Sequence, residues 1–216
     1  MAPPLDTRAF VVNSVNVATN ERADTRTRLL DQARAVYLEG GTAHFSLREV
    51  ARRVGISAAA VYRHFDGKEA LLGAVCEEGF RTFSSYLLRA LSEKTPMARL
   101  RAAGECYVRF ALENPHDYRV IFMSSVDDLE GRRKPKATTR ETSPTFQFLV
   151  DRVRECMEAR ALERGDATEV AATVWAHVHG LSSLRLSGHL SSAGDDAAFV
   201  RFFRASTDRL LRGFAP

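Results

Sequence analysis

Residues 62–68, YRHFDGK, bring together side chains that can bind phosphate. Tyrosine hydroxyls and histidine rings hydrogen-bond to phosphate oxygens, and arginine and lysine supply the opposite charge. The two alanines that precede them, Ala58 and Ala59, carry only methyl groups, which let a helix approach another surface closely. Alanine methyls can pack on thymine methyls, and Arg63 can bind guanine or phosphate. The pattern therefore favours DNA as the target surface.

Two serines stand where short helices are expected to begin, Ser46 and Ser57. The unpaired N–H groups and the dipole at a helix N-terminus attract phosphate. Arg48, early in the first of these helices, can reach a base or the DNA backbone, and Lys68 can clamp a phosphate from the start of a long helix. The candidate DNA contacts are Ser46, Arg48, Ser57, Ala58, Ala59, Tyr62, Arg63, His64 and Lys68.

A helix-turn-helix would hold these side chains in position. Ser46 and Glu49 have the spacing of a capping box that opens a helix over residues 47–54. Gly55 ends that helix, because glycine readily adopts the left-handed conformation that follows a helix C-terminus. Ser57 is then the natural cap of the second short helix.

Three small or apolar residues have the spacing that the core of this motif needs. Ala51 lets the second helix approach, Gly55 takes the turn four residues later, and Val61 locks the second helix six residues beyond. With Val61 facing inward, a rotation of about 100° per residue places Ala59 and Arg63 on the outward face. The core position and the contact candidates thus lie on opposite sides of one short helix.

The rest of the chain also predicts helices, about nine in all, so the expected fold class is all-α. Residues 1–20 carry two early prolines and no helical periodicity, and we expect a flexible arm there. A helix-turn-helix domain over residues 21–67 and a larger helical domain over 68–216 should meet at the start of a long helix. The expected helices are 21–40, 47–54, 58–65, 68–91, 96–113, 115–123, 144–164, 167–186 and 195–211, with a polar loop over 124–143.

The composition is that of a globular protein, with 45% hydrophobic and 27% charged residues and a formal net charge of +4. The three cysteines are far apart, which predicts neither a disulfide framework nor a zinc site. His177 and His179 point about 160° apart on a helix, so they cannot both bind one metal ion. No segment approaches the roughly 18 apolar residues of a membrane span. We expect no cofactor, no metal and a cytoplasmic location.

Residues 45–75, FSLREVARRVGISAAAVYRHFDGKEALLGAV, resemble the N-terminal DNA-binding domain of the TetR family of transcriptional regulators. The resemblance extends over roughly residues 21–75. Residues 175–184, WAHVHGLSSL, are similar to a subgroup of that family with a Trp/His-Gly signature (WHG subgroup). The resemblance implies a homodimer that binds a palindromic double-stranded DNA operator, typically as a repressor. It also implies that a small-molecule effector releases the DNA.

The larger domain would then bind the effector, and the last two helices would form the dimer interface. Aromatic residues at helical spacing, together with His179, are candidates for the pocket wall, although most aromatic residues at such spacing belong to a core. Their character favours an apolar or aromatic effector. The pocket candidates are Phe80, Phe83, Tyr107, Phe110, Tyr118, Phe122, Phe146, Trp175 and His179.

Three other interpretations of the sequence stay open at this point. Residues 46–68 could be an ordinary helical corner with a basic face, an all-α enzyme could contain the motif, or an adaptor could dimerise and bind protein. The sequence contains no nucleophile elbow, no HExxH motif and no glycine-rich phosphate loop, so catalysis has little support. The outward Ala, Tyr and Arg face favours the DNA interpretation, because neither an enzyme nor an adaptor needs it.

Overall fold

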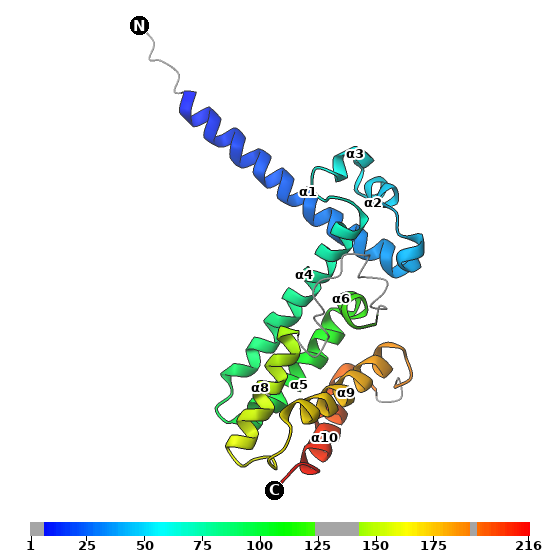
Figure 1. The fold of residues 1–216 in the computed structure, drawn as a ribbon. Coiled ribbons are helices and arrows are strands. Elements are labelled where there is room, and N and C mark those ends of the chain that lie inside the picture. Colours follow the sequence, from blue (N-terminus) through cyan, green and yellow to red (C-terminus); the bar gives the residue numbers. More distant parts are fainter. Residues whose placement is uncertain (1–6, 124–142, 191–193) are drawn as a thin grey trace. The chain divides into compact units, whose positions relative to one another are not determined.

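Helices alone build the part of the chain that the computed structural model describes, which comprises residues 7–123, 143–190 and 194–216, with side chains from residue 21 onward. Nine α-helices, one short 3₁₀-helix and one short π-helix occur within these ranges, and no strand does (Figure 1). The predicted all-α class is confirmed. No helix within these ranges is long and apolar enough to cross a membrane. The predicted polar loop lies outside the described residues, except for Ser143 at its end.

The first helix, α1, runs from Thr7 to His44, so it begins well before the predicted start. The structure therefore corrects the absence of helix predicted for residues 7–20. The physical reason is that a helix anchored at one end can grow by one hydrogen bond per residue without an apolar face of its own. Whether this segment behaves as a flexible arm stays a prediction.

The second half of α1 carries an apolar stripe whose members are buried: Leu29, Leu30, Ala33, Val36 and Tyr37. The helical conformation is interrupted at Gly41, whose φ of 62° lies in the left-handed region. The chain then turns toward α2 (Leu47–Val54), which packs against α1. Arg28 of α1 strengthens this contact, because its guanidinium donates to the carbonyl oxygen of Val54 at 2.6 Å.

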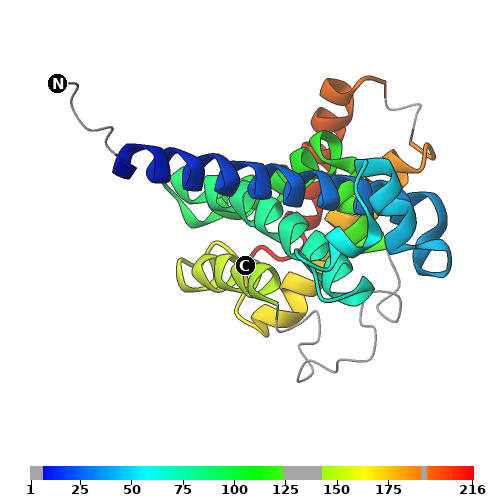
Figure 2. The ribbon, with the colours of Figure 1, turned by 90° about the horizontal axis from the view of Figure 1, so that it is seen from above.

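The turn between α2 and α3 (Ala58–Val61) has the predicted form. Gly55 has a φ of 81°, and its N–H and that of Ile56 both donate to the carbonyl of Ala51. Val61 is fully buried against this corner, as the spacing predicted. Helices α1, α2 and α3 and the start of α4 form a small unit with its own core (Figures 1 and 2).

The long helix α4 runs from Lys68 to Leu88 and continues as a 3₁₀-helix over Arg89–Ser92, close to the predicted end. The described residues divide into two compact units within α4: an N-terminal unit up to Glu77, and a C-terminal unit from Glu78 onward. The division at residue 67 drawn from the sequence, at the start of this helix, stays a proposal.

The C-terminal unit is built around α5 (Pro96–Glu113), which contacts α6 (Pro115–Tyr118), α8 (Pro144–Glu158), α9 (Ala167–Leu186) and α10 (Asp196–Arg212). A short π-helix over Arg119–Met123 follows α6. Helices α5, α8, α9 and α10 are each capped by a side-chain oxygen that accepts a backbone N–H: Thr95, Ser143, Asp166 and Asp195.

Helix α8 ends at Glu158, earlier than the predicted Arg164. Arg160 adopts a φ of 56°, which breaks the helix, and Leu162 then turns into the core. The N–H of Glu163 donates to the carbonyl of Phe214 near the C-terminus at 2.8 Å. This long-range contact fixes the end of α8, and no local sequence signal announces it.

Candidate nucleic-acid interface

The second helix of the helix-turn-helix, α3, and the turn that follows it present a buried side and an exposed side. Ala60 and Val61 are buried, whereas Ala59 and Arg63 are exposed and Ala58 is half-buried at the edge. Tyr62 has 60% of its surface exposed, the largest fraction among the exposed large hydrophobic residues of the described chain. The structure thus places the alanine methyl, the phenol and the guanidinium outward, on the side predicted from the sequence.

The two serines that precede the short helices differ in what their hydroxyls do. Ser57 Oγ accepts a hydrogen bond from the N–H of Ala60 at 3.2 Å, so it caps α3 and can still donate its own proton. Ser46 stands at the N-cap of α2 but forms no side-chain cap bond. The capping box predicted from Ser46 and Glu49 is therefore wrong.

The reason is that Glu49 binds guanidinium groups instead. Its carboxylate accepts from Arg52 at 2.7 and 2.8 Å and from Arg53 at 2.7 Å, and hydrogen bonds to charged donors are stronger than a bond to a backbone N–H. Arg53 also binds Glu39 through two hydrogen bonds. Hydrogen bonds from Arg52 and then Arg53 lower the pKa of Glu49 to about 2. These two arginines are thereby paired with acids, whereas exposed Arg48 has no such pairing among the ion pairs of the described chain.

Lys68, predicted as a phosphate clamp, is half-buried and already has partners. Its ammonium group donates to the carbonyl of Thr42 and lies 5.7 Å from the centroid of the Phe45 ring. These contacts fix the start of α4 against the end of α1. An ammonium group has three donors, so a phosphate contact stays possible chemically, and the clamp role remains a prediction.

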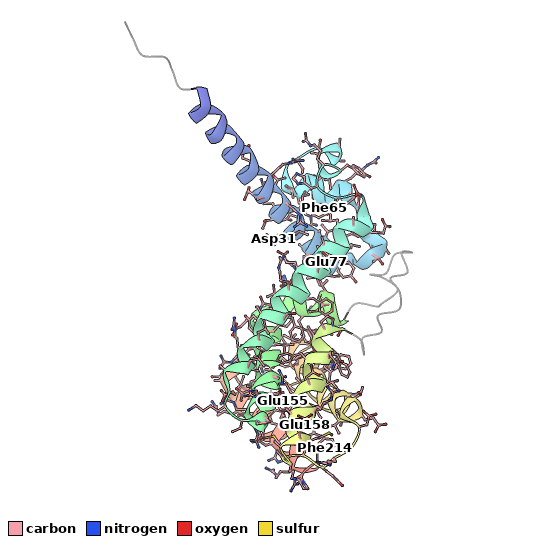
Figure 3. All side chains as sticks on the ribbon, turned by 60° about the vertical axis from the view of Figure 1, so that its left-hand side comes forward. Asp31, Phe65, Glu77, Glu155, Glu158 and Phe214 are labelled. Carbon is pink, nitrogen blue, oxygen red and sulfur yellow. The ribbon has the colours of Figure 1, made fainter. Side chains whose placement is uncertain are left out.

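Two arginines of α1 that the sequence analysis did not select lie near the predicted contacts. Burial first, and then the charges of Arg22, Arg63 and Arg26, lower the pKa of His64. The guanidinium of Arg26 also stacks over the ring of Phe65, 5.1 Å from its centroid (Figure 3). Arg22 and Arg26 are both exposed. Their signal in the sequence is an i, i+4 spacing directly before the apolar stripe of α1.

The exposed face of the N-terminal unit therefore combines small, aromatic and basic groups in one place. The charges of Arg22, Arg26 and Arg63 all act on a single imidazole, that of His64, and lower its pKa. Such a concentration of positive charge attracts a polyanion, and the exposed phenol and methyl groups beside it can contact a sugar-phosphate backbone and base edges.

The C-terminal unit encloses a cavity with an empty volume of about 690 Å³, which includes its open mouth. Helices α4, α5, α8 and α9 and the π-helix form its wall. Six of the predicted pocket residues line it: Phe80, Phe83, Tyr107, Phe122, Phe146 and Trp175. The other three predicted pocket residues do not line the cavity. Phe110 is fully buried in the core, and Tyr118 and His179 belong to a polar cluster.

That polar cluster joins α5, α6 and α9. The Tyr107 hydroxyl lies 2.9 Å from Nδ1 of His179, the Tyr118 hydroxyl lies 3.0 Å from the same nitrogen, and Ser183 Oγ lies 2.9 Å from the Tyr118 hydroxyl. His179 is thus a structural partner of two tyrosines. Within the described ranges, no group of three or more His, Cys, Asp or Glu residues is placed to hold a metal ion.

A helix-turn-helix with an outward basic face, joined through a long helix to a separate helical unit with a cavity, defines a DNA-binding regulator. The comparisons identify its family. The family model for the tetracyclin repressor-like C-terminal domain matches residues 100–210, and the model for bacterial regulatory proteins of the tetR family matches residues 29–75. The chain belongs to the TetR family. It is a regulator of transcription that binds DNA, and it is not an enzyme.

Named relatives and solved structures are similar to this chain over different shares of its length. The nucleoid occlusion factor SlmA of Photobacterium profundum is 28% identical over 176 residues, 76% of this chain and 85% of the relative. The transcriptional activator FasR of Mycolicibacterium smegmatis is 33% identical over 102 residues, 47% of each chain. A Rhodococcus sp. RHA1 protein of unknown function, 28% identical, matches with a TM-score of 0.70 over 89% of this chain and 96% of its own.

Proposed function

We propose that the protein is a ligand-responsive repressor that binds a palindromic operator as a homodimer and leaves it when a small molecule binds the C-terminal unit. The observation that carries the DNA part is the outward side of α3 and of the turn that follows it, where Ala59, Tyr62 and Arg63 are exposed while Val61 is buried. In this mechanism an effector acts only through a difference in its affinity for the DNA-bound and released conformations. We also place the protein in the cytoplasm.

The proposed dimer uses α9 and α10, and the exposed groups on these helices support it. Leu184 of α9 and Phe202 of α10 keep 42% and 41% of their surfaces exposed, and nothing lies within 4 Å of the position of a β-carbon at Gly180. Exposed apolar residues beside a small residue suit a close helix-helix interface between two subunits. Phe199 and Phe203, on the same helix as Phe202, are buried inside the protomer and belong to its own core.

We also propose membership of the WHG subgroup, whose signature maps onto Trp175, His179 and Gly180. The rings of Trp175 and His179 lie 5.7 Å apart, with Trp175 in the cavity wall and His179 in the polar cluster. The signature residues would thus connect the cavity to the proposed dimer face.

Sedimentation of the purified protein tests the proposed dimer, and a monomer at micromolar concentration contradicts it.

The operator is best found by selection from random DNA, followed by mobility-shift titration at two salt concentrations. We expect a selected sequence with two inverted half-sites about one DNA turn apart, roughly 34–36 Å, because each subunit supplies one recognition helix. Competitor-resistant binding supports the proposal. A salt-sensitive smear with no selected sequence would instead favour a helical corner with a basic face.

Matched arginine variants separate the recognition face from the paired arginines of α2. Arg63→Ala should weaken operator binding, by about tenfold if it contacts a base bidentately, because such a contact contributes roughly 1–3 kcal/mol. Arg52→Ala is the control, since Arg52 is paired with Glu49. Equal losses for the two variants would mean that only general charge acts at this surface.

Repression itself needs a transcription measurement. A reporter gene behind the selected operator should be silenced by the protein and restored by effector. The relative FasR is named as a transcriptional activator, so an increase of reporter output on adding the protein is the outcome that would reverse the proposed direction. DNA binding would stand in either case.

A further inference from the structure

The cavity of the C-terminal unit has a wall of one chemical character. Seven aromatic residues and several aliphatic ones line it, and among the described lining residues none carries a charge. The hydroxyl groups in the wall already take part in hydrogen bonds within the protein. Ser143 Oγ accepts from the N–H of Phe146 and lies 3.3 Å from Thr145 Oγ1, and the Tyr107 hydroxyl is bonded to His179.

One charged residue packs against the wall without belonging to it. Arg152 stacks on Phe148, a lining residue, with its guanidinium 4.7 Å from the ring centroid. It also binds Glu155, which is labelled in Figure 3, at 2.7 Å. Glu155 in turn binds Arg99. The single carboxylate of Glu155 thus pairs with both guanidinium groups, and none of the three residues is among those that line the cavity.

An ion that entered such a cavity would lose its hydration and find no opposite charge. The free-energy cost of burying an unpaired ion amounts to several kcal/mol even after the protein relaxes. A neutral apolar ligand has no such cost and releases water from its own surface and from the wall. The wall thus discriminates by charge before it discriminates by shape.

The rings in the wall also favour a flat partner. Phe83 meets both Tyr107 and Phe122 edge to face, with centroids 5.2 Å apart in each pair. An aromatic ligand can extend such edge-to-face and offset contacts, each of which contributes roughly 0.5–1.5 kcal/mol beyond the burial of area. Trp175, the only tryptophan of the chain, lies in the same wall and reports on the site.

We propose that this cavity binds a neutral, apolar molecule that contains an aromatic ring, and that it rejects close analogues carrying a charge of either sign. The proposal deepens the ligand response proposed above and rests on it only for the regulatory consequence. Binding itself can be measured without DNA.

The test uses three probes with one skeleton: 4-phenylbutanol, 4-phenylbutyrate and 4-phenylbutylammonium. Their binding is measured from the change in Trp175 fluorescence and from the shift in melting temperature of the full chain. We expect 4-phenylbutanol to bind at least tenfold more tightly than either ion. An ion that binds as tightly as the alcohol, or an alcohol that leaves the fluorescence and melting temperature unchanged, overturns the proposal.

Two pairs of variants locate the site. Ala103→Leu fills the wall and should weaken binding of 4-phenylbutanol about tenfold, whereas Ala102→Leu, one residue away and outside the wall, should not. Leu149→Arg adds a cation to the half-buried part of the wall and should give 4-phenylbutyrate the advantage over the alcohol. Gln147→Arg, which adds the same charge at an exposed position of α8, should leave the order unchanged. No change in preference with Leu149→Arg would contradict the charge argument even if Ala103→Leu failed to fold.

The outcome separates the two proposals. Tight binding of the alcohol with no effect on operator binding would retain this inference and remove the proposed ligand response. Release of DNA by an ion that leaves Trp175 fluorescence unchanged would retain a ligand response but place it elsewhere.

Discussion

The hydroxyl of Tyr118 and Nδ1 of His179 lie 3.0 Å apart, although they are 61 positions apart in the sequence. The Tyr107 hydroxyl reaches the same nitrogen at 2.9 Å, so two phenols from different helices share one ring atom. Tyr118 is fully buried, and burial raises the pKa of its phenol. Tyr107 also lines the cavity. The hydrogen-bonded cluster that holds Tyr118 of α6 therefore reaches the cavity wall through the side chain of Tyr107.

Tyr118→Phe should destabilise the protein without changing its fold. The substitution keeps the buried ring but removes the hydroxyl from His179 and Ser183, and leaving buried polar groups without that partner costs about 1–3 kcal/mol. Urea denaturation measures the loss in the free energy of unfolding. Tyr62→Phe is the matched control, because it removes a hydroxyl from an exposed phenol. An equal effect of both changes would show that the cluster contributes nothing specific.

Gly55→Ala should destabilise the N-terminal unit through backbone conformation alone. Gly55 has a φ of 81° and nothing lies within 4 Å of the position of an added β-carbon, so the cost is not a clash with a neighbour. A left-handed conformation costs an alanine roughly 1–2 kcal/mol. The free energy of unfolding, measured by urea denaturation, and the affinity for the operator should both decrease.

Gly73→Ala provides the opposite control in the same protein. Gly73 lies inside α4 with a helical φ, and again nothing lies within 4 Å of an added β-carbon. This change should stabilise the helix by roughly 0.5–1 kcal/mol, because alanine loses less backbone entropy than glycine. Two glycine-to-alanine changes of opposite sign would isolate the role of the turn. A stabilising Gly55→Ala would mean that the turn relaxes to another conformation.

Local signals account for most of what the sequence predicted correctly. The helix-turn-helix follows from the spacing of Ala51, Gly55 and Val61, and each of these residues acts through contacts within a few turns. The caps at Thr95 and Asp195 likewise depend only on the residue itself and the next three N–H groups. Such features are readable because the physics that creates them is short-range.

The missed features depend on which partners a side chain binds in the folded chain. Glu49 binds the neighbouring Arg52 and Arg53, and Arg53 is also held by the more distant Glu39 of α1, so the predicted capping box does not form. Phe110 and Phe83 have the same aromatic character, yet only Phe83 lines the cavity. Helical periodicity marks both as inward-facing, but only the arrangement of α4, α5 and α8 decides which ring faces the cavity.

The environment of His64 predicts a pH-dependent affinity for DNA. Burial and then Arg22, Arg63 and Arg26 lower its pKa from the ordinary 6.5, so His64 is neutral in the free protein at pH 7. The stability that comes from keeping this ring neutral is fully present above pH 6.5, the pKa of the unfolded chain. It is lost as the pH falls through the lower pKa of the folded protein. Bound phosphates would offset the arginines and favour the protonated ring.

Operator affinity should therefore rise as the pH falls from 8 to 6, with proton uptake on binding. His64→Gln should bind with little dependence on pH over that range, because no other histidine of the described chain contributes to this cluster of charges. Titrations in buffers of different ionisation enthalpy measure the protons taken up. An affinity that changes with pH equally in the variant would assign the effect to other groups.

The cysteines should react slowly while the protein is folded. Burial raises the pKa of Cys76 and of Cys156 to about 11, from an ordinary 9.0, and also raises that of Cys106. Because the thiolate is the reactive form, two pKa units lower the population of reactive thiolate by about 100-fold at pH 8. The stability that comes from burying neutral thiols is fully present below their ordinary pKa and is lost as the pH rises toward 11.

Alkylation at pH 8 followed by mass spectrometry, with and without urea, measures the difference in thiol reactivity between the folded and the unfolded protein. Rapid modification of Cys76 in the folded protein, with the other two cysteines untouched, would show that the start of α4 opens.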